Sequence, residues 1–164
     1  MEEYEFEYEY VTEVEEPRET GYEHLLRLFY NIENTDLQMF ILENQGYLPR
    51  LEDFCCARAV VQGDTKTALQ NIPETFFEKQ KIVRLCCIYN NLEIIEAIEG
   101  VRYTRIHLFH AARNNYTDIV EHILQQGNIT EFETASVANE SDITGEMEEM
   151  LLNYRNDQAG CVIL

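Results

Sequence analysis

The most regular feature of this chain is a repeating pattern of polar and apolar positions that begins near residue 22. A short polar turn is followed each time by a stretch in which apolar residues recur with the spacing of one helix face. Five positions mark these stretches, namely Leu37, Thr65, Leu92, Thr117 and Ile143. The spacings between them are 28, 27, 25 and 26 residues, and a period in this range predicts stacked supersecondary units.

Each unit is predicted to contain a helix, a tight turn, a second helix and a loop. An apolar stretch with helical spacing precedes every marker; the five are Leu25–Tyr30, Phe54–Val61, Ile82–Tyr89, Leu108–Ala112 and Phe132–Ala138. Helix breakers separate the units, at Gly46, Pro49, Pro73, Gly100 and Gly127. One helix pair cannot bury its apolar face alone, so neighbouring units must stack. The sequence therefore predicts an all-α fold, a short solenoid of about five helix-turn-helix repeats over residues 22–153.

The two ends of the chain have a different character from the repeats. Residues 4–11 alternate aromatic and acidic side chains, and residues 1–23 hold ten Glu against one Arg. Alternation is a strand pattern, but successive glutamates on one face repel, so residues 1–21 are predicted to be a disordered acidic arm that pairs as a strand when a partner offers an edge. Residues 153–160 are polar with a small, flexible end, and residues 154–164 are predicted to form a flexible tail.

The fourth unit carries a family resemblance. It contains an alanine pair, an asparagine turn, an acid, a β-branched pair and a closing glycine, namely Ala111-Ala112, Asn114-Asn115, Asp118, Ile119-Val120 and Gly127. This order resembles an ankyrin repeat, and the third unit is similar, with Cys86-Cys87 in place of the alanine pair. Small residues on the first helix let two helices approach closely, and the β-branched pair fills the groove between them.

The repeats also depart from the family. The usual ankyrin period is about 33 residues, and the units here are five to eight residues shorter. Ile106-His107-Leu108-Phe109 stands where the family has Thr-Pro-Leu-His. The resemblance covers residues 22–153 and is carried by residues 82–127; another helical-hairpin solenoid is the alternative. It implies a divergent array of the kind seen in viruses and intracellular parasites, which binds protein partners and shares no catalytic site.

The net charge and the cysteine content bear on what the protein can bind and on the compartment in which it works. The chain has 164 residues, enough for one domain with a continuous core, and a formal net charge of −19. Direct binding to nucleic acid is not expected, because it needs clustered Lys and Arg. The five cysteines lack the spacing of a disulfide framework, and neither a signal peptide nor a long apolar run is found. These features predict a cytosolic protein with reduced thiols.

The last four residues form a candidate modification site. Cys161 is followed by Val162, Ile163 and Leu164, the pattern read by protein prenyltransferases, and a final Leu favours a geranylgeranyl group. The thiol is the nucleophile and the aliphatic pair fits an apolar pocket. The alternative is an inert apolar tail. If Cys161 is modified, the protein is expected on the cytoplasmic face of host or other eukaryotic membranes, with a cytosolic pool, because no polybasic run supplies a second anchor.

Six residues are candidates for contact with a partner: Arg58, Arg84, Tyr89, Arg113, Asn114 and Tyr116. The three arginines fall on predicted first helices, where they could form a stripe that binds an acidic peptide. The favoured alternative is that they screen neighbouring glutamates or pair with the acidic arm, and Tyr89 could equally be core. Asn114 and Tyr116 lie near a turn tip and could add polar and aromatic contacts.

Catalytic and metal chemistry find little support in the sequence. His107 and His110 share a helix face, but no Cys-x-x-Cys pair accompanies them, so core or surface histidines are the favoured interpretation and neither metal nor cofactor is expected. No cysteine, histidine and carboxylate stand out as a catalytic trio. The sequence predicts a monomeric, non-enzymatic adaptor tethered to membranes by its lipid. The alternatives are a soluble acidic decoy for a basic surface of another protein, for example one that binds nucleic acid, and a small enzyme with a hidden Cys or His centre.

Overall fold

The computed structural model of the chain describes residues 33–42, 51–126, 128–143 and 145–154, and within these ranges it is all-helical. The contacts divide the chain after Glu33, and the described helices belong to the unit that begins at Asn34. Nine helices lie in the described ranges: α2 (Thr35–Leu42), α3 (Leu51–Gln62), α4 (Thr65–Gln70), α5 (Phe76–Tyr89), α6 (Leu92–Ala97), α7 (Arg105–Arg113), α8 (Thr117–Gln125), α9 (Glu131–Ala138) and α10 (Glu146–Asn153).

The all-α prediction and most predicted helices are confirmed. Helices α3, α5, α7 and α9 contain the four predicted first stretches that fall in the described ranges, and α4, α6 and α8 begin at the marker residues Thr65, Leu92 and Thr117. The predicted stretch Leu25–Tyr30, the acidic arm 1–21 and, apart from Tyr154, the tail 154–164 lie outside the described residues.

The last marker, Ile143, precedes its helix rather than lying in it. Helix α10 begins three residues later, at Glu146, after Gly145 with a backbone φ of +67°. Ile143 instead closes a turn, with its backbone N–H donating to the carbonyl of Glu140, while its side chain is only 3% exposed. The apolar side chain at this marker therefore contributes to the core from a loop rather than from a helix.

Three successive helix pairs are joined by the same tight turn. At its centre lie Gly63, Asn90 and Asn115, whose φ values are +72°, +59° and +58°. The next residue in each turn donates its backbone N–H to the carbonyl five residues back, at 2.9 Å from Asp64 to Ala59, 3.1 Å from Asn91 to Cys86 and 3.0 Å from Tyr116 to Ala111. This is the geometry of a left-handed helix end, for which Gly and Asn are the residues of least strain. The Gly or Asn that recurs in the polar turns of the sequence therefore marks a repeated backbone turn.

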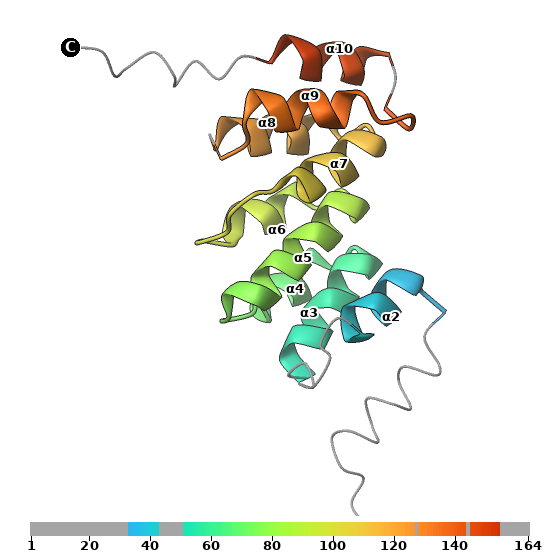
Figure 1. The fold of residues 1–164 in the computed structure, drawn as a ribbon. Coiled ribbons are helices and arrows are strands. Elements are labelled where there is room, and N and C mark those ends of the chain that lie inside the picture. The colour runs from blue at the N-terminus through green and yellow to red at the C-terminus, as the bar shows by residue number, and fades with distance from the viewer. Residues whose placement is uncertain (1–32, 43–50, 127, 144, 155–164) are drawn as a thin grey trace, which may run out of the picture. The chain divides into compact units, whose positions relative to one another are not determined.

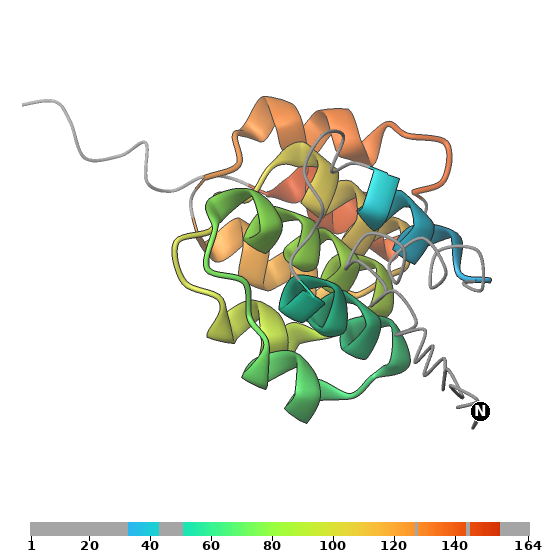
Figure 2. The ribbon, with the colours of Figure 1, turned by 90° about the horizontal axis from the view of Figure 1, so that it is seen from below.

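The helices pack in a fixed order. Helix α3 packs on α4 and α5, α5 on α6 and α7, α7 on α8 and α9, and α9 on α10. Figure 1 shows these helices succeeding one another from α3 to α10, and Figure 2 looks along the same direction. Helices α3, α5, α7 and α9 therefore form a row in which each contacts the next; we call them the first helices. The core between them is rich in small buried side chains, including Ala57, Cys86, Cys87, Ala111 and Ala112.

Candidate functional site

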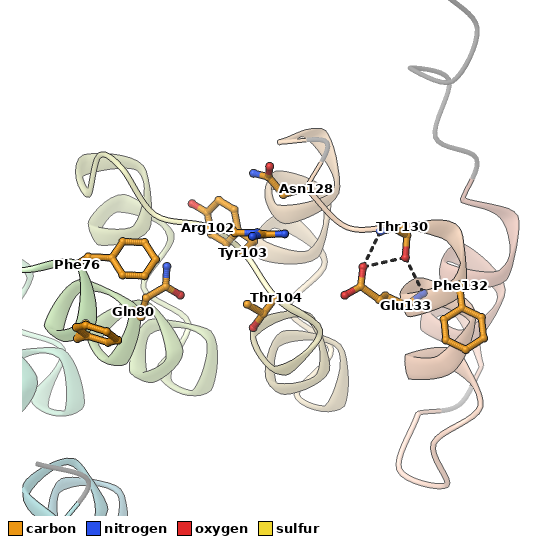
Figure 3. Close-up of a pocket in the computed structure, with 10 residues that line it drawn as sticks. Phe76, Gln80, Arg102, Tyr103, Thr104, Asn128, Thr130, Phe132 and Glu133 are labelled. Carbon is orange, nitrogen blue, oxygen red and sulfur yellow. Dashed lines mark hydrogen bonds between the residues drawn. The ribbon is translucent and has the colours of Figure 1, made fainter. Parts of the chain in front are cut away.

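A hollow of about 780 Å³ lies over the start of α5, the loop before α7 and the start of α9. Figure 3 shows Phe76 and Phe132 on opposite sides of this hollow, with Arg102 and Tyr103 between them. The lining residues are Phe76, Phe77, Gln80, Arg102, Tyr103, Thr104, Asn128, Thr130, Phe132 and Glu133. It is open, mostly apolar, and built from three consecutive units.

Helix caps place the phenylalanines at the rim of this hollow. The Thr75 hydroxyl accepts the backbone N–H of Glu78 at 3.3 Å and begins α5, so Phe76 and Phe77 lie in its first turn. The Thr130 hydroxyl accepts the backbone N–H of Glu133 and begins α9. Phe76, Phe77 and Phe132 are 49%, 75% and 83% exposed. Exposed aromatic rings around one hollow are costly in water, and several of them together typically mark an interaction site.

Two smaller hollows continue from the first. One of about 200 Å³ is lined by Gln80, Lys81, Arg84, Thr104, Ile106 and His107. The other, about 170 Å³, is lined by Asp36, Met39, Arg84, Leu85, Ile88 and His110. The first and second hollows share Gln80 and Thr104, and the second and third share Arg84. We call the three together the first-helix groove, because α5, α7 and α9 supply most of its walls.

The first-helix groove collects most of the exposed apolar side chains. Across the described ranges, six large apolar residues are exposed: Met39, Phe76, Phe77, Ile106, Phe132 and Leu152. All but Leu152 line the groove. Single exposed apolar residues are normal on a protein surface, but this distribution gathers five of six on one face.

The groove also carries charge. Its cations are Lys81, Arg84 and Arg102, and its carboxylates are Asp36 and Glu133. Asp36 accepts a 2.7 Å hydrogen bond from the Tyr89 hydroxyl. Glu133 accepts hydrogen bonds from the backbone N–H and the hydroxyl of Thr130, and these bonds lower the pKa of its carboxyl. Both carboxylates are therefore engaged within the protein, as the dashed lines of Figure 3 show for Glu133.

The structure brings only one of the three predicted arginines to this groove. Arg58, Arg84 and Arg113 lie on the first helices α3, α5 and α7, as the sequence predicts. Arg84 lines two of the hollows. Arg113 forms an ion pair with Asp142 at 3.1 Å and lies over the Phe109 ring. Arg58 is exposed and does not line any of the three hollows.

The other three candidates have structural roles. The Tyr89 hydroxyl accepts a 2.8 Å hydrogen bond from the Asn34 side chain as well as donating to Asp36, and so ties the end of α5 to the start of α2. Asn114 ends α7, where its side-chain amide donates to the carbonyl of His110 at 2.8 Å. Tyr116 is half-buried directly before α8. A partner-binding role for these three stays a prediction.

Sequence reasoning misses the aromatic part of the groove. The sequence pattern gives no functional role to Phe76, Phe77 or Ile106, and it places Phe132 only in a helix. One signal is present: Phe76 and Phe77 are adjacent and directly follow a threonine suited to cap a helix, and two neighbouring residues of a helix cannot both face one core.

The buried thiols have the environment of core residues. Burial raises the pKa of Cys56 and of Cys87 to about 12 and raises the pKa of Cys86 as well. A thiol that stays protonated is a poor nucleophile and a poor metal ligand. Within the described ranges, no three His, Cys, Asp or Glu side chains come together in a way that could hold a metal ion.

Comparison of the chain with protein-family models, with curated proteins and with solved structures finds no match. In the part of the chain that the structure describes, no helix is both long enough and apolar enough to span a membrane. Cys161, Val162, Ile163 and Leu164, the predicted lipid acceptor, lie outside the described residues.

Proposed function

We propose that this protein is a non-enzymatic, protein-binding module built as a divergent ankyrin-like array. The repeated turn at Gly63, Asn90 and Asn115, with spacings of 27 and 25 residues, supports a repeat origin for these units. The small pair Ala111-Ala112 and the β-branched pair Ile119-Val120 are fully or almost fully buried, as the close helix approach of that family requires. The raised pKa values of the buried thiols support a non-enzymatic role.

One observation carries the proposal: five of the six exposed large apolar residues in the described ranges line a single groove. When a partner covers such a surface, its apolar side chains are removed from water, and this burial favours the complex. The three hollows of the groove are open rather than enclosed, so the groove suits a protein surface or a peptide better than a small molecule.

Proximity labelling in eukaryotic cells tests this function. The full chain fused to a biotin ligase is compared with the double variant Phe77→Ser, Phe132→Ser and with the control Leu152→Ser. Truncating two exposed aromatic anchors is expected to cost about 1 kcal/mol or more each, so labelling of the specific partner falls at least about tenfold, while the control is unchanged. Identical partner sets from all three proteins would refute a function for this face.

We also propose that a geranylgeranyl group on Cys161 holds the module at host or other eukaryotic membranes. Cys161→Ser is expected to abolish incorporation of a clickable geranylgeranyl analogue and to move the membrane-bound fraction into the cytosol. Cys55→Ser, which alters a half-buried thiol on α3, is the matched control and keeps the lipid. Leu164→Ser changes the final residue to one typical of farnesylation, so it switches the incorporated lipid. Equal membrane fractions for wild type and Cys161→Ser would contradict the anchor.

The second candidate function, an acidic decoy for a basic protein surface, rests on the net charge of −19. Its complex would weaken steeply with added salt and would be insensitive to both the groove variants and Cys161→Ser. These responses separate it from the module proposed above.

A further inference from the structure

We propose that the geranylgeranyl group on Cys161 occupies the apolar hollow between Phe76 and Phe132 of the same chain whenever the protein is away from the membrane. The inference rests on the proposed lipid anchor and gives that lipid a second binding place. It follows from the apolar lining of the hollow, from the place where the described chain ends and from the length of the tail beyond it.

A geranylgeranyl group needs an apolar environment on the membrane and away from it. Each CH₂ unit that leaves water favours burial of the lipid, so a lipid exposed in the cytosol is strongly unfavourable. The sequence beside Cys161 holds no polybasic run that could act as a second membrane signal. Release from the membrane is therefore expected, and the cytosolic pool requires a protein surface that covers the lipid.

The hollow of about 780 Å³ has the lining that such a lipid requires. Phe76, Phe77 and Phe132 line it and are each about half exposed or more, and Figure 3 shows Phe76 and Phe132 on opposite sides. Ligand pockets usually have volumes of about 300–1,000 Å³, and the hollow falls within this range. An isoprenoid chain has neither a hydrogen-bond donor nor an acceptor, so contact with aromatic rings satisfies it completely.

The described chain ends close to this hollow. Tyr154 is the last described residue, and its hydroxyl donates a 3.0 Å hydrogen bond to the carbonyl of Leu124 in the last turn of α8. Asn128, which lines the hollow, follows Leu124 by four residues. Figure 1 shows the end of α10 on the same side of the molecule as the loop before α7 and the start of α9. Tyr154 is therefore held at the edge of the molecule where the hollow lies.

The length of the tail suits this arrangement. Seven residues lead from Tyr154 to Cys161, and fully extended they reach about 24 Å. The r.m.s. span of a flexible segment of this length is about 14 Å, and the four residues from Leu124 to Asn128 span at most about 14 Å. A short flexible tether gives an effective concentration in the mM range, so an intrinsic Kd of about 0.1 mM already places about nine-tenths of the cytosolic lipid in the hollow.

The lipid and a protein partner then compete for one surface. In the cytosol the lipid covers Phe76, Phe77 and Phe132, whereas at the membrane it enters the bilayer and leaves these rings exposed to a partner. Membrane attachment and partner binding therefore favour each other, because both select the state in which the hollow is empty.

Vesicle partitioning of the lipidated full chain tests this inference. The protein is geranylgeranylated in vitro, mixed with vesicles of neutral phosphatidylcholine and separated by flotation. The double variant Phe77→Ser, Phe132→Ser is compared with Leu152→Ser, which changes the exposed large apolar residue of the described ranges that lies outside the groove. Because the lipid loses its cover, the ratio of vesicle-bound to free protein is expected to rise about fivefold to tenfold in the double variant and to stay within about twofold in the control.

The direction of this change is diagnostic. Aromatic rings favour the membrane interface, so the loss of two exposed rings would lower vesicle binding if the hollow did not hold the lipid. Phe77 and Phe132 are 75% and 83% exposed, so their truncation leaves folding intact.

A binding measurement in trans examines the hollow without the tether. A trace amount of a peptide of residues 155–161, with geranylgeranyl on its cysteine and fluorescein at its N-terminus, is titrated with the Cys161→Ser protein and followed by anisotropy. Binding is expected to saturate, to weaken about tenfold when Phe77→Ser and Phe132→Ser are added, and to be lost when the peptide carries no lipid.

Several outcomes would overturn the inference. These are unchanged vesicle partitioning of the double variant, or peptide binding that ignores the two phenylalanines. Partitioning that depends on protein concentration would assign the lipid to the hollow of a second copy and would also overturn it. If Cys161 takes up no lipid, the proposed anchor fails and the inference fails with it; if it takes up lipid but the double variant partitions like the wild type, the anchor stands and only the inference is lost.

Discussion

Replacing Leu108 by alanine is expected to lower the free energy of unfolding by about 2–5 kcal/mol. Leu108 lies on α7 and has no exposed surface. Helix α7 packs on α5, α8 and α9, so a cavity at Leu108 weakens the contacts of the fourth unit with both of its neighbours. The loss is a large fraction of the stability of about 5–15 kcal/mol that is usual for a domain. Urea denaturation followed by far-UV circular dichroism measures it.

Leu152→Ala is the matched control for this substitution. It removes the same atoms from a leucine on α10 whose side chain is 53% exposed. Its expected effect on the free energy of unfolding is within about 0.5 kcal/mol, as for most surface substitutions. Equal effects at the two positions would mean that α7 does not lie in a continuous core, and the packing order of the helices would then be wrong.

The helix pairs were predictable because their turns depend on local chemistry. Gly63, Asn90 and Asn115 are residues that accept a positive φ, and each ends a helix at a recurring interval in the sequence. The first helices were predictable because small buried residues such as Ala111 recur among larger apolar ones. Both signals lie within a few residues of the feature that they predict, so no knowledge of the tertiary contacts is needed.

The groove was not predictable in the same way, because exposure depends on which helices cover a residue. An aromatic residue in the first turn of a helix, such as Phe132, fits the helical pattern whether it faces the core or water. Tyr89 shows the same limit: its hydroxyl is used by Asn34 and Asp36, more than fifty residues earlier in the chain. Ile143 is a third case, since a buried apolar residue in a turn has the same sequence signature as one in a helix.

His107 is the buried group whose titration is expected to affect stability most. Its side chain is 4% exposed, its Nδ1 accepts the backbone N–H of Thr104 at 3.1 Å, and its Nε2 lies 3.2 Å from the carbonyl of Gln80. A neutral imidazole with its proton on Nε2 satisfies both contacts, whereas a proton on Nδ1 would face the N–H of Thr104. Burial, the main cause, and the charges of Arg84 and His110 lower the pKa of His107 to about 4.

The sign of the pH effect follows from the neutral folded form. Above the ordinary pKa of 6.5, His107 is neutral in both states and its contribution to stability is complete. As the pH falls from 6.5 towards about 4, His107 binds a proton in the unfolded chain but stays neutral in the folded protein, so the folded state loses stability. A difference of this size corresponds to about 3 kcal/mol across that range.

His107→Gln isolates this contribution. Glutamine three residues after a threonine cap can accept the same backbone N–H of Thr104 but does not titrate. The chain's carboxylates are common to both proteins, so their titration cancels when the two unfolding free energies are subtracted at each pH. The wild type is expected to lose about 3 kcal/mol relative to His107→Gln between neutral pH and about pH 4, and to show no such relative loss above pH 6.5. Parallel stability profiles for the two proteins would mean that His107 is protonated in the folded state or exposed to water, and the packing of α7 against α5 at Gln80 would need revision.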